Sequence, residues 1–270
     1  LNPVLNAFCT VTAEYAKQVA REAEAAIMAG EPLGPLHGVP VSIKDIVLTN
    51  GVRTTRGSSR YEWFVPEEDA PIVRRLKNAG AIMVGKTTTP ELGWKGTTDS
   101  PLLGTTRNPW NPDLTPGGSS GGASAAIAAG LAPLAVGTDG GGSIRIPASF
   151  AGIYGLKPSF GRVPYYPPSA VEPLSHAGPM TRTVGDAALM LSVLAGPYEK
   201  DRNTLPHEGI DYEAVTREDV AGLRLAWSPD LGYARVDPEV AAATESAARA
   251  FEEAGCVVEQ LETDIDDPID

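Results

Sequence analysis

The chain has 270 residues, enough for one large domain or two small ones with a substantial buried core. Its 34 acidic and 22 basic residues give a formal net charge of −12, which disfavours nucleic acid and anionic membrane surfaces as partners. No stretch approaches the roughly 20 apolar residues of a membrane span, so a globular protein acting on small molecules is expected.

The cysteines indicate the cellular compartment of the protein, and the first residue indicates whether the chain is a fragment. Cys9 and Cys256 lie at opposite ends of the chain, without the spacing of a metal site or of a disulfide framework. This favours unpaired thiols in a reducing compartment, and therefore a cytoplasmic protein without a bound metal. The chain starts at Leu1 without a signal-peptide pattern. Because the initiator methionine is missing, we expect a fragment of a longer protein.

The first half of the chain alternates helix and strand patterns. Residues 10–28 predict an amphipathic helix closed by Gly30, because apolar residues recur at spacings of four: Val11, Tyr15, Val19, Ala23 and Ile27. Residues 38–45 form a short strand-like run that ends near Lys44. We further expect a helix over 66–79, a strand over 81–84, a helix over 123–129 and a strand over 134–136.

The second half continues the same alternation. It predicts a strand over 153–156, a proline-rich loop over 158–179, a helix over 184–195, a strand over 223–227, a helix over 238–254 and a strand over 256–259. The linker-like segment 197–220 is expected to bridge parts of one sheet. Alternating strands and helices predict an α/β fold layered around a largely parallel sheet. We expect one domain over 1–270, with residues 221–262 adding a strand, a helix and a strand to the same sheet.

Two glycine-rich turns stand out, residues 115–122 (TPGGSSGG) and 137–145 (GTDGGGSIR). Each presents a serine, and Ser119 and Ser143 are 143 − 119 = 24 residues apart. Glycine costs conformational entropy, so its accumulation needs a physical reason. One such reason is that backbone N–H groups must come close to a ligand or to an oxyanion.

Two familiar motifs match by letter only. Residues 80–87 (GAIMVGKT) fit the phosphate-loop pattern, but four consecutive apolar residues after a helix indicate a strand. Ser119 and Ser120 both satisfy G-x-S-x-G, yet Pro109 and Pro112 exclude the strand that a nucleophile elbow needs. A Ser-His-Asp triad would draw on three histidines, His37, His176 and His207, for which structural or solvated positions are expected.

Lys44 is the remaining candidate base. A lysine accepts a proton only when neutral, so its pKa of about 10.4 must fall by roughly three units, at a cost of about 4 kcal/mol. A strand's carboxyl end is where α/β sheets place their sites. Taken alone, the residue also fits a surface lysine or one paired with Asp45.

Residues 38–45, 115–122, 137–148 and 155–158 closely resemble the amidase signature family, in the family's order and serine spacing. The resemblance extends from about residue 5 to residue 194, with a signature core at about 36–195. It implies a layered α/β/α fold with a mixed, largely parallel central sheet, and we expect this fold to be incomplete at its C-terminal side. It also implies no cofactor and a Ser-Ser-Lys triad, with Ser143 as acylated nucleophile, Ser119 as bridging serine and Lys44 as base.

The resemblance assigns roles to the two turns. The bridging serine would follow a cis peptide bond, Gly118–Ser119. The N–H groups of Gly140, Gly141 and Gly142, with that of Ser143, would form the oxyanion hole. Asp139 and Arg145 would form a charge pair that holds the loop, and Ser120 would hydrogen-bond around the triad.

Three functions remain open. The first is hydrolysis of a small-molecule amide. The second is the glutaminase subunit of a tRNA-dependent amidotransferase, although such subunits usually carry glutamine where this chain has Ile146. The third is a non-catalytic glycine nest that binds an anion, which would not need Lys44. In a fragment, an exposed sheet edge would favour aggregation or a homodimer.

Overall fold

The computed structural model describes residues 1–263 and contains a first compact unit, Leu1–Thr216, and a second that begins at Arg217. The helices of the first unit are α1 (Asn2–Leu5), α2 (Ala13–Ala29), α3 (Pro71–Asn78), α4 (Gly121–Ala128), α5 (Arg145–Ala151), α6 (Val184–Leu194) and α7 (Tyr212–Val215). Its strands are β1 (Phe8–Val11), β2 (Pro40–Lys44), β3 (Ile82–Thr87), β4 (Asp99–Ser100), β5 (Gly104–Thr105), β6 (Leu134–Asp139), β7 (Tyr154–Gly155) and β8 (His176–Thr181). None of the described helices is long and apolar enough to cross a membrane.

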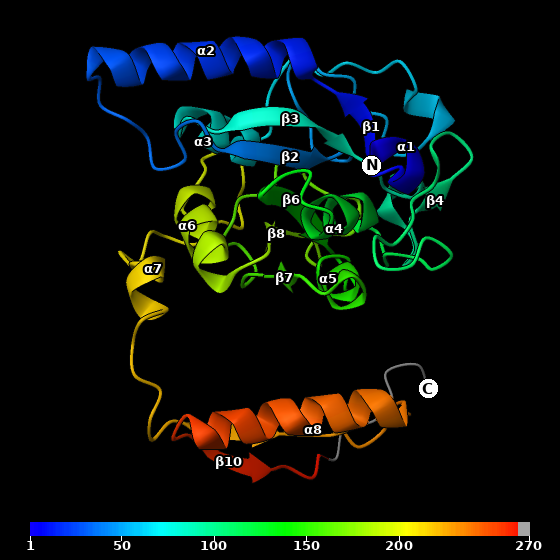
Figure 1. Cartoon of the computed structure of the whole chain (residues 1–270), viewed down its shortest axis with the longest axis vertical. Helices are drawn as coiled ribbons and strands as arrows, with labels where there is room; N and C mark the ends of the chain where they lie inside the picture. The colour runs from blue at the N-terminus through cyan, green and yellow to red at the C-terminus, as the bar shows by residue number, and fades with distance from the viewer. Residues whose placement is uncertain (264–270) are drawn as a thin grey trace. The chain divides into compact units, whose positions relative to one another are not determined.

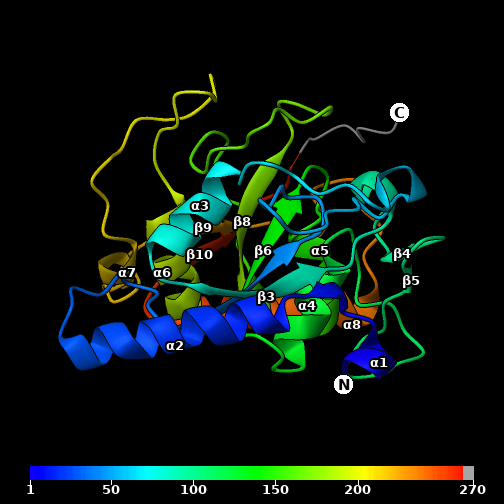
Figure 2. The same cartoon turned by 90° about the horizontal axis from the view of Figure 1, so that it is seen from above.

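The first unit is built on a six-stranded sheet with the order β1-β3-β2-β6-β8-β7. The central strands β3, β2 and β6 run parallel, and the pairs towards both edges are antiparallel. Figure 2 shows α3 and α6 on one side of the strands and α4 and α5 on the other. Because side chains alternate along a strand, Val136 packs in the core that includes α6, while Ala135 packs with α4. The predicted layered α/β/α fold with a mixed sheet is confirmed.

Two helices begin later than predicted. The chain from Phe8 to Val11 is a strand that pairs antiparallel with β3, so α2 starts only at Ala13 (Figure 1). The other helix, α3, starts at Pro71 rather than at residue 66, because proline suits the first turn of a helix. The helices themselves are confirmed.

The buried face of α2 differs from the predicted one. Tyr15 and Ile27 are 38% and 55% exposed, whereas Ala23 is buried. The helix lies beside β3 (Figure 1). Its less exposed positions are Ala16, Val19, Ala23 and Ala26. The helix follows β1, which pairs with β3, and spacing alone does not contain this tertiary contact.

The predicted loop over residues 158–179 is wrong at its end, where β8 begins at His176. This strand pairs with β6 on one side and β7 on the other. Its sequence, HAGPMT, contains glycine and proline, which are rare in central strands. The Pro179 carbonyl still accepts a 3.1 Å hydrogen bond from the Leu156 N–H, and Ala177 and Met180 are fully buried. Burial therefore outweighs a poor strand propensity here.

The second unit contains β9 (Arg224–Trp227), α8 (Pro238–Glu253) and β10 (Val257–Gln260). The predicted strand, helix and strand are all formed. The two strands pair in parallel as a two-stranded sheet of their own, whereas the sequence analysis placed them in the larger sheet. Val257 and Gln260 are exposed, so this short sheet is not enclosed by the unit itself. The assignment of the chain to one domain stays a prediction.

Replacing Gly122 by alanine should destabilise the first unit by about 1–3 kcal/mol, because it overpacks a closed contact. An added Cβ would meet Thr88 Oγ1 and the Thr88 backbone N–H, and would lie 2.7 Å from the Ala7 carbonyl oxygen. Gly185, also the second residue of its helix, has no atom within 4 Å of such a Cβ. Thermal unfolding should show a lower Tm for Gly122→Ala and an equal or higher Tm for Gly185→Ala. Equal effects of the two substitutions would contradict the close packing of α4.

Candidate active site

The predicted site residues gather at the carboxyl ends of two central strands of the sheet. Strands β2 and β6 are parallel neighbours, so Lys44 and Asp139 end them on the same side. Just beyond these strand ends, Ser119 precedes α4 and Ser143 precedes α5. The fold thus joins three segments that are remote in sequence.

Lys44 is completely buried and contacts the first glycine turn. Its Nζ donates hydrogen bonds to Ser119 Oγ at 2.7 Å and to Thr138 Oγ1 at 2.9 Å. Burial lowers the pKa of Lys44 to about 7, against the opposing effect of the Asp139 charge. The alternative of a surface lysine is wrong. So is pairing with Asp45, whose carboxylate accepts a 3.0 Å hydrogen bond from the Thr55 N–H instead.

The first glycine turn is tightly enclosed. The Gly118–Ser119 peptide bond is cis, which confirms the prediction. A Cβ on Gly118 would lie only 2.5 Å from the Thr97 carbonyl oxygen, so no larger residue fits there. Ser119 itself is 2% exposed. The turn therefore holds the Ser119 hydroxyl against Lys44.

The second glycine turn is tied to the first through Ser120. The Ser120 N–H donates a 3.2 Å hydrogen bond to the Ser143 carbonyl, and Ser120 Oγ donates to the Thr138 carbonyl at 3.2 Å. Ser119, Thr138 and Ser143 line the same cavity of about 370 Å³. The two serines thus face a common space large enough for a small substrate.

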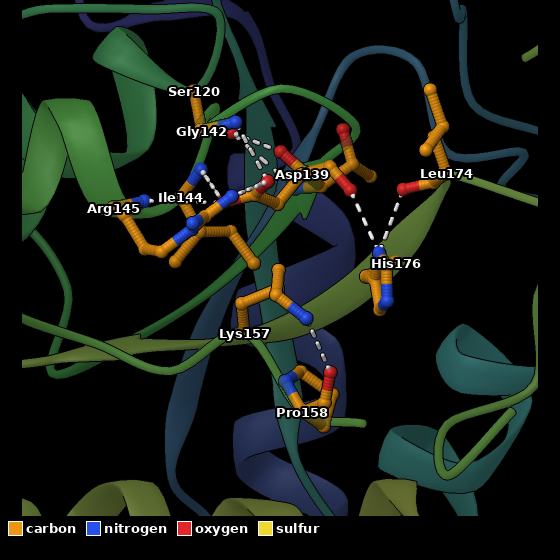
Figure 3. Close-up of polar contacts among 10 residues, drawn as sticks. Ser120, Asp139, Gly142, Ile144, Arg145, Lys157, Pro158, Leu174 and His176 are labelled. Carbon is orange, nitrogen blue, oxygen red and sulfur yellow. Dashed lines mark hydrogen bonds and ion pairs between the residues drawn. The ribbon is translucent and has the colours of Figure 1, made fainter. Parts of the chain in front are cut away.

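Asp139 organises the loop that carries Ser143 (Figure 3). Arg145 donates to both carboxylate oxygens of Asp139, from Nη2 at 2.9 Å and from Nε at 3.0 Å, as the predicted charge pair requires. Burial alone would raise the pKa of Asp139, but hydrogen bonds from Arg145, Gly142 and Ile144 outweigh it and lower the pKa to about 2. The carboxylate is therefore ionised at any physiological pH and acts as a fixed anchor.

The three glycines predicted to form the oxyanion hole are not equivalent. The Gly142 N–H donates a 2.8 Å hydrogen bond to Asp139 Oδ1 (Figure 3), so it is already occupied. For the N–H groups of Gly140, Gly141 and Ser143, residues 1–263 supply no acceptor. Gly140 and Gly141 line the cavity beside Ser143. The carboxylate thus occupies one predicted donor and leaves three backbone donors at or beside Ser143.

Thr138 was not among the predicted site residues. Its hydroxyl accepts the second hydrogen bond of Lys44, and its side chain lines the cavity. With Ser119 on one side and Thr138 on the other, the lysine head is held at two points. The residue precedes Asp139 in the second glycine turn, and that position was the one available indication in the sequence.

A second lysine, Lys86, is equally buried but serves another purpose. It lies in β3, so the expectation that residues 80–87 form a strand and not a phosphate loop is confirmed. Its Nζ donates to Thr49 Oγ1 at 3.0 Å and to Thr54 Oγ1 at 2.9 Å, and burial lowers its pKa to about 8. Neither partner belongs to a glycine turn, whereas the candidate base Lys44 contacts Ser119 in the first of these turns.

The histidines bind backbone groups, as expected of structural positions. His37 Nε2 lies 2.9 Å from the Ala23 carbonyl, and His207 Nδ1 accepts a 2.9 Å hydrogen bond from the Gly209 N–H. His176 Nδ1 lies 2.7 Å from the Leu174 carbonyl and 3.2 Å from that of Asp139 (Figure 3). Within residues 1–263, no group of three or more His, Cys, Asp or Glu side chains could hold a metal ion.

Comparison with known proteins gives a consistent picture. The family model described as Amidase matches residues 1–267. An acylamidase of Rhodococcus erythropolis is 45% identical over 259 residues, which cover 96% of this chain and 54% of that protein. The A subunit of the glutamyl-tRNA(Gln) amidotransferase of Carboxydothermus hydrogenoformans is 42% identical over 262 residues, 97% of this chain and 54% of the subunit. The chain spans about half the length of the curated relatives it matches.

The solved structures agree with these matches. The structure of a bacterial aryl acylamidase, described as a member of the amidase signature enzymes, superimposes with a TM-score of 0.92 at 38% identity. The superposition covers 97% of this chain and 55% of that one. The similarity therefore includes nearly the whole chain, glycine turns included.

Proposed function

The chain belongs to the amidase signature family, and from that membership we propose that it hydrolyses the C–N bond of a carboxylic acid amide through an acyl-enzyme on Ser143. One observation carries the proposal. A fully buried lysine with a pKa of about 7 donates a 2.7 Å hydrogen bond to a serine that shares a cavity with the nucleophile. About half of such a lysine is neutral at pH 7, and the neutral form can accept a proton along that contact.

The proposed chemistry is a proton relay. Neutral Lys44 takes the proton of Ser119, Ser119 takes that of Ser143, and the Ser143 oxygen attacks the amide carbonyl. When the tetrahedral intermediate collapses, the proton returns along the same path to the departing nitrogen, because an unprotonated amine is a poor leaving group. Water then attacks the acyl-enzyme with the same relay, which releases the acid and restores Ser143.

We place the oxyanion hole on the N–H groups of Gly140, Gly141 and Ser143. These donors have no acceptor among the described residues, and the first two line the cavity. Each donor of this kind contributes about 2.7–4 kcal/mol to the stabilisation of the transition state. Gly142 supports them indirectly, since its bond to Asp139 fixes the loop.

Labelling with a fluorophosphonate tests the nucleophile directly. The reagent should modify one serine, Ser143, and peptide mapping by mass spectrometry should locate it there. The substitution Ser143→Ala should abolish labelling. Ser175, which lines the same cavity outside the glycine turns, supplies the matched control, and Ser175→Ala should label like the wild type. Labelling of Ser143→Ala at another residue would overturn the assignment.

A second candidate is the glutaminase subunit of an amidotransferase, favoured by the relatives that carry that name. Ile146, which stands where such subunits usually carry glutamine, lines the cavity, and an apolar residue at this position favours a general amidase. Ammonia release from glutamine at a higher kcat/KM than hydrolysis of a neutral anilide would favour the second candidate.

The free cysteines Cys9 and Cys256 support the cytoplasm as the proposed compartment.

A further inference from the structure

A second cavity adjoins the catalytic one. Its volume is about 390 Å³, close to that of the cavity around Ser143. The two cavities share lining residues, among them Ile46, Leu92 and Tyr165. A substrate bound at Ser143 can therefore extend into this second space.

One charged residue lines the second cavity, Arg56. The other lining residues of the described chain are apolar, aromatic or uncharged, including Tyr61, Trp94 and Tyr166. No carboxylate of residues 1–263 lies within ion-pair distance of Arg56, and its buried Nε has no hydrogen-bond partner. Arg56 as a whole is half-buried, and the Nε that has lost contact with water has gained no anion in exchange.

The backbone fixes Arg56 in this position. Its φ of 54° lies in the left-handed region, which is uncommon for a residue with a side chain. The Arg56 N–H donates to the Asp45 carbonyl at 3.0 Å, and its own carbonyl accepts from the Leu92 N–H at 2.7 Å. These bonds connect the Arg56 loop to the residue after Lys44 and to the wall shared by both cavities.

Two aromatic rings lie beside the guanidinium of Arg56. Its Cζ lies 4.8 Å from the centre of the Tyr61 ring and 5.8 Å from that of Phe64. Cation–π contact uses the face of the guanidinium, whereas a carboxylate binds its N–H edge, so both can occur together. Burial raises the pKa of Tyr165 to about 12, an effect that the Arg56 charge partly offsets. The Tyr165 phenol therefore stays protonated and does not supply a counter-ion.

We propose that the cavity around Arg56 is a subsite for a carboxylate carried by the substrate, so that the preferred amides are anionic. The inference rests on the proposed amide hydrolysis and names its substrate class. A carboxylate would accept two hydrogen bonds from the guanidinium edge while the rest of the substrate packs on apolar walls. The carboxylate belongs either to the acyl part or to the amine part of the amide.

The experiment compares matched anilides with the 270-residue protein. Monoanilides of linear dicarboxylic acids from four to eight carbons carry the charge on the acyl part, and their neutral partners are alkanoyl anilides of equal length. N-alkanoyl-4-aminobenzoates carry the charge on the amine part. The measured quantity is the ratio of kcat/KM for the charged substrate to that for its neutral partner, which does not depend on the fraction of active protein.

For the wild type, we expect kcat/KM for the charged anilide to exceed that for its neutral partner at least about tenfold. This preference should occur in one of the two substrate series, at one optimal chain length. Arg56→Met should lower that ratio about ten- to a hundredfold, mainly through KM, as expected for charge-assisted hydrogen bonds. Arg56→Lys should keep part of it. Arg53 supplies the control: it stacks on Trp63 in the same loop, does not line the cavity, and Arg53→Met should keep the wild-type ratio.

Each other outcome has a defined meaning. A wild-type ratio of one or less in both series, or equal losses in Arg56→Met and Arg53→Met, would overturn the subsite while leaving amide hydrolysis intact. A wild-type preference that survives Arg56→Met would overturn it as well. Absence of both anilide turnover and Ser143 labelling would instead overturn the proposed function, and the subsite with it.

Discussion

Replacing Lys44 by methionine should lower kcat/KM for amide hydrolysis by about 10³- to 10⁴-fold, in the upper part of the range for general base catalysis. Methionine keeps the length and burial of the side chain but cannot accept a proton. The Lys44 head contacts Ser119 and Thr138, so its loss removes the base without opening the cavity wall. Steady-state kinetics on a neutral anilide measure the effect.

Lys86 provides the matched control for this substitution. It is as buried as Lys44 and also has a lowered pKa, but its polar partners are Val47, Thr49 and Thr54. Per folded molecule, Lys86→Met should retain most of the activity even where it lowers Tm. Similar rate losses in both variants would show that the loss of any buried lysine lowers the rate, and that the effect of Lys44→Met does not come from the loss of a base.

The pH profile of the wild type follows from the same residue. Since the pKa of Lys44 is lowered to about 7, the neutral base is present above that pH and is protonated below it. Log kcat/KM should therefore fall with a slope of one below about pH 7 and level off above it. Asp139, with a pKa of about 2, stays ionised throughout and adds no second slope. A flat profile from pH 5 to 8 would be incompatible with Lys44 as base.

Replacing Ser119 by alanine should lower kcat/KM by about 10³-fold, because it interrupts the relay between Lys44 and Ser143. The adjacent Ser120 is the natural comparison, since both side chains are buried. Ser120 Oγ contacts the backbone of Thr138 and lies outside the proton path, so Ser120→Ala should cost at most about tenfold. Fluorophosphonate labelling rates should follow the same order.

The opposite order would reverse the roles of the two serines. A larger loss in Ser120→Ala than in Ser119→Ala would mean that the link between the turns matters more than proton transfer. Equal losses would point to disruption of the turn as a whole. Circular dichroism of both variants establishes whether the fold is kept.

The sequence predicted the parts of the site that local patterns encode. Glycine clusters and a strand terminus are visible in the letters and drew attention to Ser119, Ser143 and Lys44, whereas their roles came from the resemblance to the amidase signature family and stay predictions. The sequence did not show that the Asp139 carboxylate accepts a hydrogen bond from the Gly142 N–H. This bond removes Gly142 from the predicted oxyanion donors. Which donor stays free depends on how the loop closes, and closure is a property of the folded loop.

The elements show the same division. Strand β8 was missed because Gly178 and Pro179 disfavour a strand, while its place between β6 and β7 is a tertiary effect. The helix α2 was predicted, but its buried face was not, because the helix follows β1, which pairs with β3, and spacing does not contain this tertiary contact. Thr138 and Lys86 were overlooked for a related reason, since their roles come from burial next to segments distant in sequence.

The position of β2 between β3 and β6 has a consequence for the order of events during folding. Lys44 and Ser119 are 75 residues apart along the chain, and Lys44 and Thr138 are 94 apart. Contacts at such separations form slowly, after local structure. Until β6 has been synthesised and has paired with β2, Lys44 is an ordinary solvated cation and the serines are ordinary alcohols. We therefore expect the proposed reactivity to arise only when β6 has paired with β2.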